Sequence, residues 1–266
     1  KDMFITLLPI ALGADPEFEE TDKTLDEAEA AEAHLSAEAG GSWTAGNTDF
    51  WVISGTLDGN YRWAANKIGL QAGALQGKSL PDIDGDGIIS DSERDNDRVL
   101  NAERYFGDVR YDRFLGERNS LYILAGAFTD PFAGYDFRSH EQLGYSRVLA
   151  DGETLKLVAE LGFDVAHEFY VEGVDPDYAD VFAARAMLGL DLSFSENVSF
   201  SDDLEVFENV LDAQDLRVLN TAALTMKLNS KLSFKVSHAL TFDNQPVEGY
   251  RPLDQTTMAT VVATLL

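Results

Sequence analysis

The sequence predicts an all-β protein: a transmembrane, antiparallel, up-and-down β-barrel of about 12 strands with both termini on the periplasmic side. Three observations support this fold. Apolar and polar residues alternate along many segments, short and long connections alternate between those segments, and aromatic residues are spaced to mark both edges of a bilayer. A soluble β-sandwich or lipocalin-like barrel, with the apolar residues facing inward, is the alternative.

The composition narrows the possible functions. The chain of 266 residues has 47 acidic and 20 basic residues, a formal net charge of −27, and no cysteine. Without cysteine there are no disulfides, zinc thiolate sites or thiol nucleophiles. The negative charge excludes nucleic acid as a partner, because the phosphate backbone would be repelled, and favours divalent cations. No apolar run reaches the roughly 18 residues of a membrane-spanning helix.

Residues 1–32 are expected to precede the barrel. The apolar run Met3–Leu12 resembles a signal-peptide remnant, and a periplasmic anchor or a partner-binding segment is the other interpretation. An acidic linker or short helix follows. The barrel itself is expected to occupy residues 33–266.

The clearest predicted strand runs from Trp51 to Trp63. Its apolar and glycine residues fall on one face, and Ser54, Asp58 and Arg62 fall on the other. Twelve steps of about 3.3 Å, tilted by about 40°, separate the two tryptophans by roughly 30 Å along the membrane normal. We therefore expect these tryptophans to lie in opposite aromatic girdles.

The same alternation predicts the remaining strands and connections. The other strands are predicted over residues 33–43, 67–75, 105–114, 121–128, 135–149, 155–165, 182–194, 198–210, 216–228, 232–242 and 257–266. Short turns are predicted at 64–66, 116–119, 150–153, 195–197 and 229–231, and mostly longer loops at 78–98, 129–134, 172–177, 212–215 and 244–255. Two acids, Glu141 and Asp202, fall on apolar faces. If the short turns are periplasmic, the long loops are extracellular.

The longest loop contains a calcium-loop motif, Asp82 to Glu93, with the sequence DIDGDGIISDSE. The predicted ligands are Asp82, Asp84, Asp86, the backbone carbonyl of Ile88, Ser90 and the bidentate carboxylate of Glu93. Gly87 would form the sharp turn and Ile89 would pack inward. Alternate positions of a tight loop bring oxygens to one point, as Ca2+ requires. An acidic surface turn is the alternative.

The flanks of this motif favour strands over helices. Pro81 stands directly before it, several glycines precede it, and residues 105–114 alternate with a period of two. The loop at 78–98 is therefore expected to join two strands and to become ordered when Ca2+ binds. Three further aspartates, Asp91, Asp95 and Asp97, leave open whether one ion or two bind.

Three segments resemble the YdiY-like family of salt-induced outer-membrane proteins. They are Gly46–Asp49 after Trp43, the segment from Ala102 to Leu115, and the segment from Arg138 to Tyr145. The resemblance covers residues 33–266. It implies a bacterial outer-membrane barrel of unknown function with no catalytic residues to transfer. The calcium loop departs from the family pattern as an insertion, and Leu266 replaces the aromatic residue usual at barrel C-termini.

The predicted lumen is charged with both signs. It contains Asp58, Arg62, Arg104, Asp108, Arg110, Asp112, Lys156, Glu160, Asp164, Arg185, Asp191, Arg217, Lys227 and Lys235. In a narrow barrel such mixed charges favour a salt-bridged filling over an open pore. The favoured function is a non-enzymatic surface scaffold, in contact with outer-membrane lipids, whose long loop is ordered by Ca2+. A contact bridged by Ca2+ to acidic lipid head groups or to another outer-membrane protein is a further interpretation. A porin-like channel for ions or small solutes is the alternative.

A calcium-dependent outer-membrane lipase is a third hypothesis, because the chain contains neighbouring serines and histidines. Ser139–His140 and Ser237–His238 are adjacent along strands, so the members of each pair point to opposite faces. A cross-strand pair is the arrangement that remains open. His238, on the predicted lipid face, is the residue to examine.

Overall fold

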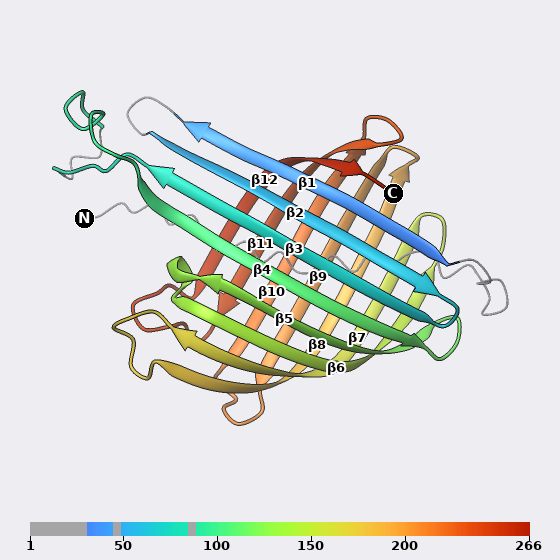
Figure 1. The fold of residues 1–266 in the computed structure, drawn as a ribbon. Helices are drawn as coiled ribbons and strands as arrows, with labels where there is room; N and C mark the ends of the chain where they lie inside the picture. Colours follow the sequence, from blue (N-terminus) through green and yellow to red (C-terminus); the bar gives the residue numbers. More distant parts are fainter. Residues whose placement is uncertain (1–30, 45–48, 85–88) are drawn as a thin grey trace.

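The computed structural model describes residues 31–44, 49–84 and 89–266, and in them the chain forms a closed antiparallel barrel of twelve strands (Figure 1). The strands are β1 (Glu32–Thr44), β2 (Phe50–Trp63), β3 (Asn66–Ser79), β4 (Val99–Phe114), β5 (Asn119–Asp130), β6 (Tyr135–Asp151), β7 (Leu155–Tyr170), β8 (Tyr178–Ser195), β9 (Val198–Asn209), β10 (Leu216–Lys227), β11 (Leu232–Asp243) and β12 (Leu253–Thr264). A short 3-10 helix, η1 (Pro131–Ala133), follows β5. The predicted all-β antiparallel barrel of twelve strands is confirmed, and the periplasmic placement of both termini stays a prediction.

The predicted faces of β2 are confirmed by exposure. Ile53 and Tyr61 are 56% and 44% exposed on the outer wall, whereas Asn60 is buried inside. Glu141 does lie on the outer face of β6, because its neighbours Leu143 and Phe137 are also exposed there. Among the described residues, no helix is long and apolar enough to cross a membrane.

Several strands are longer than their hydrophobic patterns predict. Pairing between β3 and β4 continues to Ser79 opposite Val99, past an irregularity at Gly77 and Lys78. β12 begins at Leu253, because its first residues pair with β11. Once neighbouring strands are aligned, the ladder gains a hydrogen bond from every further residue whatever its polarity, so polar residues extend strands that alternation alone would end.

Both ends of the barrel sequence meet at the end that carries the short turns. Leu265 donates its backbone N–H to the carbonyl of Leu35 at 2.8 Å, and the C-terminus lies beside the start of β1 (Figure 1). The opposite end carries the longer connections, including the one between β3 and β4. The short turns therefore lie at one end of the barrel and the longer loops at the other, as the alternation of connection lengths predicts.

The seam between β1 and β12 is the shortest pairing in the barrel. Its register extends only from Ser36 opposite Thr264 to Gly40 opposite Thr260, whereas β1 pairs with β2 along its whole length. At Gly40 a Cβ atom would lie 2.4 Å from Cγ2 of Thr260, and at Gly41 one would lie 2.8 Å from the carbonyl oxygen of Val52. Two glycines therefore stand where the described pairing ends, and they permit a close approach that a side chain would obstruct.

The lumen is not polar throughout. Near the long-loop end, Val52, Leu75 and Ala102 form a buried apolar cluster, and Phe50 and Met258 pack against it. A smaller cluster of Ala166, Val181 and Ala183 packs with Phe207 on the wall formed by β7, β8 and β9. Polar and charged side chains fill the interior between these patches.

Candidate functional site

The acidic loop brings three of its predicted metal ligands together. Carboxylate oxygens of Asp82, Asp84 and Glu93 lie within 4.8 Å of one another. Asp86 and Ile88, two other predicted ligands, lie outside the described residues. Such a group of hard oxygen donors fits Ca2+ better than a transition metal.

Glu93 is fixed in place by hydrogen bonds to its carboxylate. The backbone N–H of Ile83 donates to it at 2.6 Å, and the backbone N–H and hydroxyl of Ser90 donate at 2.8 and 2.7 Å. The Ser90 hydroxyl, followed by the two N–H groups, lowers the pKa of Glu93 to about 2. Ser90 and Glu93 have the Ser-x-x-Glu spacing of a helix capping box, and the bond from the Ser90 N–H to the Glu93 carboxylate is one of its two hydrogen bonds. A single turn follows at residues 91–95.

The loop is tied to the rim of the barrel by Asp49, which directly precedes β2. Arg98 donates to the Asp49 carboxylate at 2.6 Å, Arg94 lies 3.5 Å from it, and the backbone N–H of Leu80 donates to the Asp49 carbonyl at 2.9 Å. Ile89 is 8% exposed, which confirms its predicted inward packing. The anchors place the acidic group at the long-loop end.

In the lumen, the carboxylate of Glu160 on β7 joins two arginines from opposite directions. Arg110 on β4 donates to it at 2.6 and 3.2 Å, and Arg185 on β8 donates at 2.7 Å. Arg110 also pairs with Asp112, and Arg185 with Glu205. Because β5 and β6 lie between Arg110 and Glu160, this ion pair crosses a corner of the interior.

Tyr122 on β5 fills the space beneath that ion pair. Its ring lies 4.1 Å from the Arg110 guanidinium carbon, and its hydroxyl accepts a hydrogen bond from Arg185 at 2.7 Å. A Cβ atom at Gly144 or Gly162 would come within 2.5 or 2.6 Å of the Tyr122 side chain. The two glycines therefore create the flat wall on which the ring packs.

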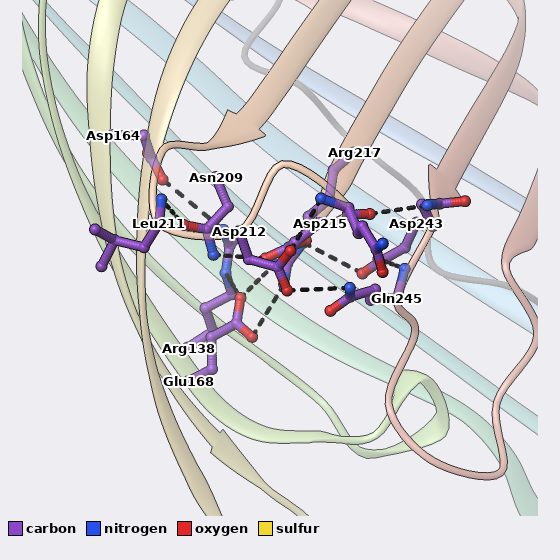
Figure 2. A network of polar contacts seen from close by, with 12 residues as sticks. Arg138, Asp164, Glu168, Asn209, Leu211, Asp212, Asp215, Arg217, Asp243 and Gln245 are labelled. Atoms are coloured by element: carbon purple, nitrogen blue, oxygen red, sulfur yellow. Dashed lines mark hydrogen bonds and ion pairs between the residues drawn. The ribbon is translucent and has the colours of Figure 1, made fainter.

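Glu168, also on β7, forms a second junction nearer the long-loop end (Figure 2). Arg138 donates to it at 3.0 Å, and Arg217 reaches it from β10 past β8 and β9. Arg217 also lies 3.2 Å from Asp215 and 3.3 Å from Asp243. The Glu160 and Glu168 side chains are both fully buried, so β7 supports two ion-pair junctions, which we term the lumen braces.

The space left by the braces is a cavity of about 320 Å3. Its lining extends from Glu117 and Arg118 in a short turn to Val247 and Tyr250 in the loop between β11 and β12. The Tyr250 hydroxyl donates to the Pro131 carbonyl at 3.2 Å, which joins that loop to η1 over the long-loop end. The cavity therefore has lining residues at both ends of the barrel.

Most predicted lumen charges do face the interior, but the sequence did not indicate their partners. Lys227 shares a face of β10 with Ala223 and Thr225 and is exposed at the end of that strand. Glu205, Asp243 and Tyr122 were missing from the predicted set although each takes part in or supports a brace. Strand alternation places Glu205 and Asp243 on the inner face, so that signal was available, whereas the role of Tyr122 depends on glycines in two other strands.

The outer wall carries a polar group around His167. Its Nδ1 lies 2.6 Å from Asp180, and its Nε2 lies 3.8 Å from Glu141. Ser139 stands opposite His167 in the register of β6 and β7. His238 contacts the Thr257 hydroxyl at 2.9 Å. Ser139 and His167 are thus neighbours across two strands, as the lipase hypothesis requires. However, the Nε2 atom of His167 faces the carboxylate of Glu141 and not the serine hydroxyl.

The closed twelve-stranded wall with an apolar outside and a charged, braced inside is that of an outer-membrane-type β-barrel. A solved NanC porin matches with a TM-score of 0.52 at 10% identity, covering 87% of this chain and 100% of that one. The translocator domain of the autotransporter NalP from Neisseria meningitidis matches at 11% identity and a TM-score of 0.46, covering 89% and 88%. These likenesses concern the fold alone.

The sequence comparisons then give the family. The model of the DUF481 family, described as a protein of unknown function, matches residues 37–265, and the chain belongs to this family. The uncharacterized protein YdiY of Escherichia coli strain K12 is 24% identical over 162 residues, which is 61% of this chain and 61% of YdiY. The aligned part thus spans about three fifths of that relative.

Proposed function

We propose that this protein is a scaffold barrel of the bacterial outer membrane, with its long loops outside the cell, its termini in the periplasm, and no enzymatic activity. The observation that carries the proposal is the pair of lumen braces. Arg110 and Arg217 each reach across two intervening strands to a fully buried glutamate. Such fixed charges occupy the interior of a narrow barrel rather than line a wide pore.

Single-channel recording in planar bilayers tests this closed state. The unmodified protein is expected to give no large, steady conductance steps, and the double variant Arg110→Ser, Arg217→Ser is expected to give them, because it removes both cross-lumen side chains. Lys231→Ser removes an exposed charge in a short turn and serves as the control. Large steps from the unmodified protein, equal to those of the double variant, would overturn the scaffold proposal.

A narrow ion channel is the second candidate, because the cavity has lining residues at both ends of the barrel. Of all the residues that line the cavity, ten are arginine or lysine and nine are aspartate or glutamate, so the lining has little net charge. This function would give small steps with weak selectivity between anions and cations. Their dependence on a calcium chelator would connect them to the acidic loop.

We propose that Ca2+ is the ligand of the acidic loop, held by Asp82, Asp84 and Glu93 together with Asp86, Ser90 and the carbonyl of Ile88. The convergence of three carboxylates supports this ligand set. Binding would neutralise repulsion among them and order the loop, while the hydrogen-bond ladder maintains the barrel independently. Calcium in this loop could also bridge to acidic lipid head groups or another outer-membrane protein.

Calorimetric titration with Ca2+ tests the ligand set. Asp82→Ala combined with Glu93→Ala should abolish binding while the heat-modifiable gel migration of the folded barrel is retained. Asp177→Ala, in the loop between β7 and β8, controls for the loss of an acid at the same end. Undiminished calcium affinity in the double variant would contradict the assignment.

The absence of enzymatic activity is tested with a fluorophosphonate probe, which labels activated serines. We expect Ser139 to remain unlabelled, because Nε2 of His167 faces Glu141 rather than accepting a proton from a serine hydroxyl. Labelling that disappears in both Ser139→Ala and His167→Ala would instead establish a lipid-facing hydrolase.

A further inference from the structure

An arrangement of three side chains occurs twice at the short-turn end of the outer wall. In the first, the Asn66 side-chain oxygen accepts hydrogen bonds from the Tyr111 hydroxyl at 2.7 Å and from Arg113 Nη1 at 2.9 Å. In the second, Asn119 accepts from Tyr145 at 2.5 Å and from Arg147 at 3.1 Å. We call these the Asn–Tyr–Arg clusters.

The two clusters share the same strand register. Asn66 at the start of β3 is opposite Arg113 on β4, and Asn119 at the start of β5 is opposite Arg147 on β6. In each case the tyrosine lies two residues before the arginine, on the same face. The repeated Tyr-x-Arg sequence, together with an asparagine that begins the preceding strand, therefore builds one geometry twice.

The position of the clusters coincides with the edge of the apolar wall. Toward the middle of the wall, the outward residues Val109 and Leu143 are 44% and 62% exposed. Trp63 packs near Tyr111 at a ring-centroid distance of 6.4 Å. Aromatic rings of this kind mark the boundary between hydrocarbon and head groups, so both exposed arginines stand at the depth of the lipid phosphates.

The chemistry of the clusters suits a phosphate. A guanidinium has five donors in a planar fork that matches phosphate oxygens, and the asparagine uses one of them in each cluster. That bond limits the rotation of a long side chain, so less entropy is lost when a head group binds. Arg113 on β4 and Arg147 on β6 lie on either side of β5, opposite Leu121 and Asn119 respectively. Two strand spacings and an offset of two residues place the two arginine backbones about 12 Å apart.

We propose that the two Asn–Tyr–Arg clusters are binding sites for the phosphate head groups of anionic phospholipids in the leaflet that faces the short turns. Each site takes one phosphate, on Arg113 or Arg147, with the tyrosine ring against the acyl-chain boundary. Asn66 and Asn119 are positioning residues. The inference concerns a surface separate from the lumen and the acidic loop, so it stands whether or not the scaffold proposal holds.

Native mass spectrometry of the full chain released from detergent, titrated with phosphatidylglycerol, tests the sites. We expect two lipids to bind preferentially to the unmodified protein, one to Arg113→Ala or Arg147→Ala, and none preferentially to the double variant. Each lost contact should weaken binding on the order of fivefold, which is typical of one basic residue at a lipid surface. Inorganic phosphate should not displace the lipids, because it lacks acyl chains.

Two further variants separate geometry from charge. Lys231→Ala removes a positive charge from a short turn at the same end and should leave two lipids bound. Arg113→Lys with Arg147→Lys keeps the charge but not the planar fork, and should bind more weakly than the unmodified protein. Equal retention by the double alanine variant and the unmodified protein, or an equal loss in Lys231→Ala, would overturn the proposal.

Discussion

Replacing Arg185 by methionine tests the lumen braces most directly. Methionine retains much of the apolar stem but removes the charge that Glu160 and Glu205 share at 2.7 Å each. The cluster of Arg110, Arg185, Asp112, Glu160 and Glu205 has two positive and three negative charges, so one positive charge would remain against three negative ones. The Glu160 side chain is fully buried and cannot be compensated by water.

The expected cost follows from this imbalance. Removing one partner of a buried ion pair typically costs about 3–5 kcal/mol. Because Arg110 continues to neutralise Glu160, we expect a loss near the lower limit, about 3 kcal/mol in the free energy of unfolding. Adding Glu205→Gln removes the carboxylate left without Arg185 and should recover at least about 1 kcal/mol of that loss, as a coupled pair does.

Equilibrium unfolding in urea, followed by tryptophan fluorescence of the barrel in lipid vesicles, measures both values. Glu117→Gln, an exposed short-turn acid, should change the free energy of unfolding by less than about 0.5 kcal/mol. Our reasoning is refuted if Arg185→Met costs no more than this control, or if Glu205→Gln destabilises the Arg185→Met variant further.

Three other predictions concern local features. Gly162→Ala should destabilise the barrel by about 1–3 kcal/mol in the same urea assay, because its Cβ would meet the Tyr122 hydroxyl at 2.6 Å and the Leu143 carbonyl at 2.8 Å, whereas Gly69→Ala has open space and should not. Asp49→Ala should speed proteolytic cleavage within residues 80–98 without changing barrel unfolding, and equal cleavage rates would disprove the anchor. In chelator, the Glu93 carboxylate should titrate by NMR near pH 2 rather than 4.5, and Ser90→Ala should raise that value. Since this pKa is lowered in the folded loop, its stabilising contribution is present above pH 4.5 and is lost as the pH falls toward 2.

Alternation predicted the barrel because it reports the environment of each residue directly. The strand from Trp51 to Trp63 has one apolar and one polar face, and these faces form the outside and the inside of the barrel wall. The pattern was weaker at strand ends. Ser79, Val99 and Leu253 are in strands because neighbouring backbones align with them, and one-dimensional periodicity contains no information about that alignment.

The candidate sites were predictable to different degrees. The acidic loop is local in sequence, so the spacing of its residues alone brought Asp82, Asp84 and Glu93 together. The braces are not local: Glu168 and Arg217 are 49 residues apart in sequence, and which charges meet depends on the number of strands between them. The Asn–Tyr–Arg clusters likewise require the register between β3 and β4, or between β5 and β6, before their repetition becomes visible.

The short pairing of β1 with β12 also bears on how the barrel is assembled. β1 and β12 are the first and last strands of the described barrel, and their pairing converts an open sheet into a closed cylinder. The register pairs of this seam extend only from Ser36 to Gly40, and backbone hydrogen bonds between Leu35 and the last two residues add to them at one end. The β1–β12 seam is still the shortest pairing in the barrel, so reopening under force or heat should begin there. If the cell's barrel-assembly machinery holds the folding sheet open, the junction of β1 and β12 is the place where the sheet would close as the barrel is released.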